Sequence, residues 1–152
     1  MALNLGTRIR RRTAPEPVVL DCDLCVVGSG AAGISAALEG ARLGRRVVLV
    51  DAQPALGGQA VNGIVGTFCG LFSNGPRPHR VTYGVASDLL DALGRAGAAS
   101  PRRARNSIIV HYDETALARW MEQAVSAAGV VPLLGAVLRE VAVEGRRLTR
   151  LR

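Results

Sequence analysis

Aromatic residues are scarce in this sequence, and lysine is absent from it. Tyr, Phe and Trp together make up 3% of the chain, so few rings are available to stack on nucleic-acid bases. The 19 basic residues are all arginines, and 12 acidic residues leave a net charge of +7, a balance that suits a polyanion. Because so few aromatic rings are available for stacking on bases, we expect no nucleic-acid partner.

Cysteine is also sparse, and no long apolar run occurs. Three cysteines cannot form a disulfide framework, which indicates a reducing compartment and therefore a cytoplasmic protein. The one charge-free stretch long enough to span a bilayer, residues 52–76, contains six glycines and two prolines. A membrane helix does not have that composition, so we expect no membrane span.

The length of 152 residues suits one domain, and 49% hydrophobic residues are enough to build its core. Residues 1–20 are rich in arginine and are expected to form a flexible tail. Residues 21–152 are expected to form an α/β domain, in which residues 52–105 are a glycine-rich loop and a helical insertion.

Short apolar runs at residues 23–27 and 47–50 flank a helical pattern at residues 31–43. This order predicts a strand, a helix and a second, parallel strand, with the strands buried on both faces. The rest of the chain is predicted as an irregular loop (52–82), a helix (84–96), a linker (97–105), a strand (107–112), a helix (114–128) capped by Asp113, a strand (130–134) and a hairpin (136–143 with 147–151).

A G-x-G-x-x-G motif, Gly28-Ser29-Gly30-Ala31-Ala32-Gly33, lies between the first predicted strand and the helix. Gly28 permits a sharp turn, Gly30 lets backbone approach a pyrophosphate, and Gly33 lets the helix pack on the strand. The free N–H groups at the start of the helix then face the phosphates. The motif predicts a dinucleotide site.

Asp51 ends the second predicted strand, 23 residues after Gly28. This is close to the ~20-residue offset at which an acid accepts hydrogen bonds from a ribose. A carboxylate there also repels a 2′-phosphate, which disfavours NADP.

The stretch DLCVVGSGAAGISAALEGARLGRRVVLVDAQPALGGQAV resembles the N-terminal FAD-binding segment of FAD-dependent oxidoreductases of the glutathione-reductase structural class, including the fumarate-reductase-like branch. The later segment, residues 110–151, is similar to that group's helix, third strand and start of a β-meander. The resemblance implies a Rossmann-like fold with a parallel sheet and FAD as the cofactor. It implies these cofactor-binding residues: Gly28, Ser29, Gly30, Ala31, Ala32, Gly33, Asp51, Ala52, Gly57, Gly58, Gln59 and Val137. Val137 is expected to contact adenine through its backbone.

Members of this family also carry a substrate domain and later motifs that this sequence lacks. We therefore expect an incomplete FAD-binding domain that a second polypeptide completes, with a small-molecule substrate and catalytic residues that the sequence does not identify. Two alternatives stay open: an NAD-binding dehydrogenase domain, and a non-catalytic assembly subunit that retains the fold.

The remaining candidates favour structural roles. Cys22 and Cys25 form a C-x-x-C without a second pair, and His79 and His111 lack metal-ligand spacing, so no metal site is expected. The resemblance places Cys69 near the flavin or substrate cavity, although small-residue packing is the simpler interpretation. His79 is expected on a loop surface, and two further residues are expected in the core: Trp120 and Met121.

Overall fold

The computed structural model describes residues 17–152, so most of the expected tail lies outside the described residues. Residues 17–20 have no regular structure and are exposed. The elements, in chain order, are β1 (Leu24–Val27), α1 (Ala31–Arg42), β2 (Val47–Asp51), α2 (Gln59–Asn62), β3 (Thr67–Phe68), α3 (Val85–Arg95), β4 (Ala99–Ala104), β5 (Ser107–Tyr112), α4 (Glu114–Ala127), β6 (Val131–Leu134), β7 (Val141–Glu144) and β8 (Arg147–Leu151).

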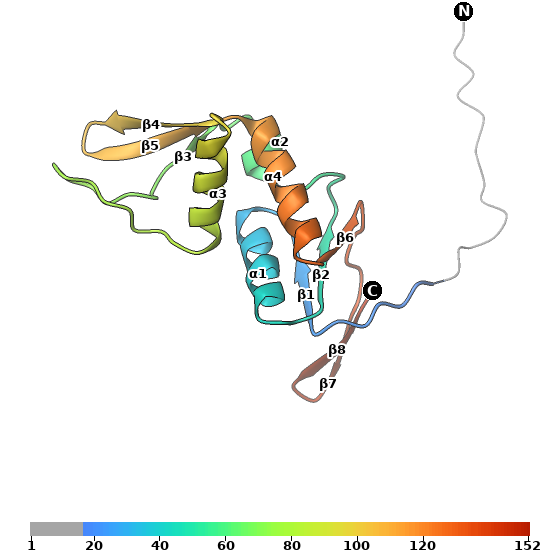
Figure 1. The fold of residues 1–152 in the computed structure, drawn as a ribbon. Coiled ribbons are helices and arrows are strands. Elements are labelled where there is room, and N and C mark those ends of the chain that lie inside the picture. Colours follow the sequence, from blue (N-terminus) through green and yellow to red (C-terminus); the bar gives the residue numbers. More distant parts are fainter. Residues whose placement is uncertain (1–16) are drawn as a thin grey trace, which may run out of the picture.

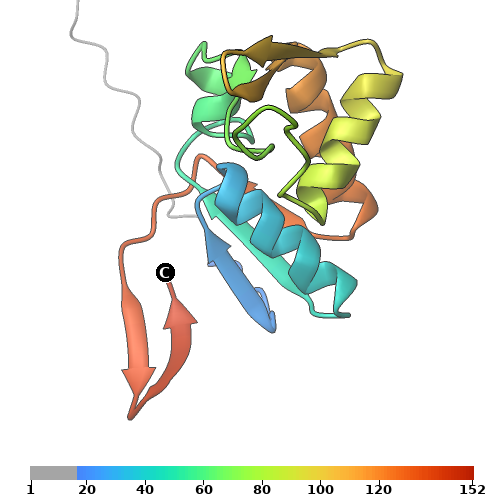
Figure 2. The ribbon, with the colours of Figure 1, turned by 90° about the vertical axis from the view of Figure 1, so that its left-hand side faces the viewer.

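A parallel three-stranded sheet in the order β1-β2-β6 forms the centre of one half of the molecule (Figure 1). Val26 pairs with Leu49, and Leu49 pairs with Pro132. Helix α1 connects β1 to β2 and lies across both strands (Figure 2). The predicted strand, helix and parallel strand are therefore confirmed, and the chain is an α/β protein with a partial Rossmann-like sheet.

The core lies between one face of this sheet and helices α1, α3 and α4. Leu49 of β2, Ile34 of α1 and Leu117 of α4 are almost completely buried there. Met121 is buried in the same core and Trp120 packs against it, which confirms the expectation for both. Asp113 caps α4, as predicted, by accepting a hydrogen bond from the Ala116 N–H at 2.7 Å.

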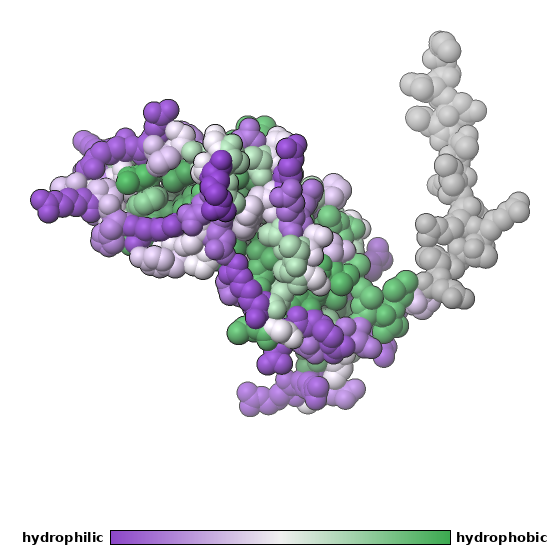
Figure 3. Space-filling view, in the orientation of Figure 1, coloured by the Kyte–Doolittle hydropathy of each residue, from purple (hydrophilic) through white to green (hydrophobic). Residues whose placement is uncertain are grey.

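The other face of the parallel sheet is open, contrary to the expectation of strands buried on both faces. Alternation along the strands puts Val27, Val131 and Leu133 on the face opposite the core, and they are 54%, 44% and 37% exposed. Hydrophobic surface also gathers around the segment that leads into β1 (Figure 3), where Val18 and Val19 are exposed. Val48 of the central strand lies on the same face but is buried, so among residues 17–152 this face is covered only in part.

Strands β3, β5 and β4 form a separate antiparallel sheet at the far end of α3 (Figure 1). The predicted linker at residues 97–105 was wrong, because β4 occupies most of it and pairs with β5 from Ala99↔Tyr112 to Ala104↔Ser107. Pro101 disguised the strand, but β4 is an edge strand, where proline is tolerated. The predicted loop at 52–82 likewise contains two short elements, α2 and β3.

The C-terminal hairpin of β7 and β8 turns at Gly145, which has a φ of +61°. Its first strand begins at Val141, so the prediction of a strand from residue 136 was wrong at that end. The reason is that residues 135 and 136 donate their N–H groups to the chain around Asp51 instead of to a hairpin partner. No helix within residues 17–152 is long and apolar enough to cross a membrane.

Candidate functional site

The glycine motif connects the end of β1 to the start of α1. Gly28 has a φ of +100°, a conformation that only glycine adopts easily, and its N–H donates to the Val50 carbonyl at 2.7 Å. Gly30 is the N-cap of α1 and has an extended backbone, with a φ of −69°. No side chain caps this helix start, which leaves its N–H groups available to an anion.

The three motif glycines meet different surroundings. A Cβ on Gly33 would lie 1.7 Å from the Gly28 carbonyl oxygen, so glycine is required there for packing. A Cβ on Gly30 would meet nothing within 4 Å, and the φ of Gly30 suits any residue. The fold itself therefore does not require glycine at position 30. The open space in front of Gly30 is the cradle that a pyrophosphate needs.

Asp51 lies at the end of β2, directly beside the glycine motif. Its Oδ2 accepts hydrogen bonds from the N–H and the hydroxyl of Ser29, at 2.5 and 2.6 Å. Its Oδ1 accepts a bond from the Gln53 N–H at 2.8 Å. Ser29 itself is completely buried. The structure thus brings Asp51 into contact with the motif, although Ser29 and Asp51 are 22 residues apart in the sequence.

These hydrogen bonds hold the pKa of Asp51 below its ordinary value, with the Ser29 hydroxyl as the largest cause and the Gln53 N–H as the next. The carboxylate is therefore ionised at neutral pH, which makes it a strong acceptor for ribose hydroxyls. Sequence reasoning missed Gln53. Asp side chains often accept a hydrogen bond from the backbone N–H two residues later, in an Asx-turn. That tendency could have identified the Gln53 N–H as a partner of Asp51.

The second glycine pair lies against the first motif. The Gly57 N–H donates to the Ser29 carbonyl at 2.9 Å, and a Cβ on Gly58 would lie 2.9 Å from the Gly30 Cα. Both glycines have positive φ, +102° and +52°. Gln59 follows at the start of α2. The two glycine segments therefore form one continuous backbone surface.

A hollow of about 230 Å³ adjoins the Asp51 side of the motif. The Ala136 N–H donates to the Asp51 carbonyl at 3.0 Å and so fixes the chain after β6 beside β2. Four of the residues that line the hollow were expected from the resemblance to bind the cofactor, and four were not. Its lining consists of Val27, Gly28, Val50, Asp51, Ala52, Ala136, Val137 and Leu138.

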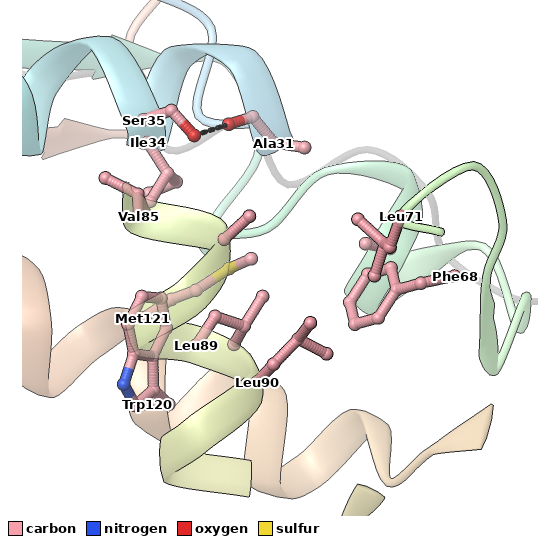
Figure 4. A pocket seen from close by; sticks show the side chains of 12 residues that line it. Ala31, Ile34, Ser35, Phe68, Leu71, Val85, Leu89, Leu90, Trp120 and Met121 are labelled. Atoms are coloured by element: carbon pink, nitrogen blue, oxygen red, sulfur yellow. Dashed lines mark hydrogen bonds between the residues drawn. The ribbon is translucent and has the colours of Figure 1, made fainter. Parts of the chain in front are cut away.

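An apolar pocket of about 140 Å³ lies on the other side of the motif, between α1, α3 and α4 (Figure 4). Ala31 and Ala60 line it next to the two glycine segments, and Phe68 and Leu71 close one side. The hydroxyl of Ser35 is already bonded to the Ala31 carbonyl at 2.8 Å. The pocket therefore suits an apolar group.

The cysteines and histidines take no part in either cavity. Burial raises the pKa of the Cys25 thiol on β1, which opposes thiolate chemistry. Cys69 is exposed, although its neighbours line the apolar pocket. His79 is exposed on its loop, as expected, and its Nδ1 is hydrogen-bonded to the Ser73 hydroxyl at 2.9 Å. No three His, Cys, Asp or Glu side chains within residues 17–152 are placed to hold a metal ion.

Parallel strands, a tight glycine turn and an acid at the end of the second strand define a dinucleotide-binding protein. The family model of FAD dependent oxidoreductases matches residues 23–152, and the chain belongs to that family. This match confirms the resemblance drawn from the sequence and favours FAD over NAD as the cofactor.

Individual proteins are similar to parts of the chain. Dihydrolipoyl dehydrogenase of Manduca sexta is 48% identical over 42 residues, which are 28% of this chain and 8% of that protein. The structure of Aquifex aeolicus GidA matches 87% of this chain and 22% of its own, with 19% identity and a TM-score of 0.59. Thermovibrio ammonificans THI4 matches 86% and 46%, with 20% identity and a TM-score of 0.53. The chain thus spans less than half the length of these proteins.

The residues present fit FAD. The free space at Gly30 and the start of α1 suit its diphosphate, and the ionised Asp51 suits its ribose. When bound, the flavin supplies hydride or electron transfer, while the protein supplies position and electrostatics.

Proposed function

We propose that this chain holds the ADP and ribityl part of FAD in a flavin-dependent oxidoreductase, and that a second polypeptide completes the substrate site. The observation that carries the proposal is the contrast among the motif glycines. Packing requires Gly33 and conformation requires Gly28, whereas neither requires glycine at position 30, where the open space suits a ligand.

Each part of the cofactor has a matching surface. The adenosine end is assigned to the hollow that contains Asp51 and Val137. The diphosphate is assigned to the N-terminus of α1 at Gly30, where backbone N–H groups and the helix dipole favour negative charge. The ribityl chain is assigned to Gly58 and Gln59, which continue the same backbone surface.

The open sheet supports the proposal of a second polypeptide. Within the described residues, the outer edge of β1 pairs with no strand. On the face opposite the core, Val27 of β1, and Val131 and Leu133 of β6 at the other edge of the sheet, leave apolar surface exposed. Exposed apolar surface next to an unpaired edge marks a docking site and an aggregation hazard. We infer that the partner adds strands at the β1 edge and covers this apolar face, through an obligate interface of more than about 2,000 Å².

Co-expression tests this proposal. The chain alone is expected to be poorly soluble or flavin-free, whereas the complex should be stable and yellow in size-exclusion chromatography monitored at flavin wavelengths. Leu133→Asp should prevent the complex, while Ile64→Asp, at a position 91% exposed on a loop outside the sheet, should not. A soluble monomer with stoichiometric FAD would contradict the need for a partner. A stable complex without any nucleotide would favour the assembly-subunit alternative.

A further inference from the structure

Ser29 was expected among the residues that touch the cofactor, but its side chain is buried and bonded to Asp51. It is completely buried, and its hydroxyl donates to Asp51 Oδ2 at 2.6 Å. The Ser29 N–H donates to the same oxygen at 2.5 Å. A side chain enclosed in this way contributes to the site only through the group that it holds.

The hydrogen bonds around Asp51 are distributed unequally over its two carboxylate oxygens. A carboxylate has two oxygens and about four lone-pair positions. The two bonds from Ser29 occupy both positions of Oδ2, and the Gln53 N–H occupies one of Oδ1 at 2.8 Å. Oδ2 is therefore turned toward the motif, and Oδ1 is the oxygen that can still accept a hydroxyl.

Ser29 also connects the acid to the second glycine pair. Its carbonyl oxygen accepts the Gly57 N–H at 2.9 Å. The neighbouring Gly30 Cα lies where a Cβ on Gly58 would be only 2.9 Å away. Ser29, a buried residue of the first glycine motif, thus contacts both the acid and the second glycine pair.

We propose that Ser29 is a positioning residue, which orients the Asp51 carboxylate so that Oδ1 faces the ribose of the nucleotide. The assignment of a ribose to Asp51 rests on the proposed function. The hydroxyl fixes the rotamer of Asp51, and its charge-assisted bond stabilises the ionised form of the carboxylate. The other groups facing this carboxylate are backbone N–H groups of Ser29, Ala52 and Gln53.

The first experiment needs no nucleotide. Carbon-13 NMR follows the titration of the Asp51 carboxyl in the chain labelled at aspartate, purified with the polypeptide that completes it, and Asp51→Asn identifies the signal. Ser29→Ala should raise the pKa of Asp51 toward its ordinary value. Ser73→Ala is the matched control, because it removes another serine that bonds a titratable side chain, His79, in a different loop. An unchanged Asp51 titration in Ser29→Ala would overturn the proposal.

The second experiment measures ADP binding against pH in a double-mutant cycle. Ser29→Ala should weaken ADP binding about tenfold. Because the ionised carboxylate accepts the hydroxyl more strongly than the protonated form, the pH below which ADP binding weakens should also be higher in Ser29→Ala. In the Asp51→Asn background, Ser29→Ala should have little further effect.

The outcomes separate the two proposals. An equal loss of ADP affinity in both backgrounds would show that Ser29 acts through the fold and not through Asp51, which would overturn the positioning role. If the wild-type protein bound no ADP, the proposed function would fail. The NMR titration would then still decide whether Ser29 holds Asp51.

Discussion

Replacing Gly30 with valine should remove FAD binding and leave the fold intact. Position 30 has an ordinary φ of −69°, and a Cβ there meets no atom within 4 Å. Valine is a poorer N-cap than glycine, but it also restricts the unfolded chain, so the free energy of unfolding should change by no more than about 1 kcal/mol.

The loss of cofactor affinity should be much larger. The new side chain would occupy the space in which backbone N–H groups meet the diphosphate. Hydrogen bonds to a charged group contribute about 1.5–3 kcal/mol each, so losing two of them weakens FAD by about 100-fold or more. Isothermal titration with FAD of the flavin-free complex of the chain and its partner polypeptide measures this loss, and urea unfolding measures stability on the same sample.

Gly33→Ala is the matched control and should show the opposite behaviour. Its methyl group would lie 1.7 Å from the Gly28 carbonyl oxygen, so the backbone must move. Overpacking of this severity costs about 3 kcal/mol or more, which lowers Tm by roughly 6–12 °C in a domain of this size. Full FAD retention by Gly30→Val, or strong destabilisation by it, would refute the reasoning about the motif.

Three further changes test other parts of the structure. Asp51→Ala should weaken FAD by about 1.5–3 kcal/mol, and wild-type affinity should fall as the pH drops through the lowered pKa of Asp51; a titration calorimeter measures both. Asp113→Ala should lower the free energy of unfolding by about 1 kcal/mol in urea, because α4 loses its cap. The Arg46 guanidinium holds the pKa of Asp23 at about 2, so the stability that this pair contributes is complete above pH ~4 and is lost toward pH 2. Urea unfolding of Asp23→Asn should lack this part of the acid dependence.

Local signals in the sequence were sufficient for the nucleotide-binding half of the fold. Short β-branched runs ending at Gly28 and Asp51, with a helical pattern between them, predicted β1, α1 and β2 to within two residues. The motif glycines were informative because backbone conformation is a local property. Strand β4 was missed because Pro101 and the arginines around it hide an edge strand whose partner is the only evidence for it.

The open face of the sheet and the contacts of Ser29 could not be predicted from local patterns. Val27 and Leu133 have the composition of buried strand residues, and whether they are covered depends on elements elsewhere in the chain or in a partner. The bond between Ser29 and Asp51 joins residues 22 apart, and only the pairing of β1 with β2 brings them together. The expected adenine contact of Val137 stays a prediction, although the chain after β6 places this residue in the hollow beside Asp51.

The most direct test of the account is to purify the chain from its native source and identify every co-purifying nucleotide and polypeptide by mass spectrometry. We predict FAD, in a stoichiometric amount, together with a second polypeptide. FAD should be lost from the same preparation when the chain carries Gly30→Val. Recovery of NAD in place of FAD, or of a stable assembly that contains no nucleotide, would contradict the claim that this chain holds the ADP half of a flavin cofactor.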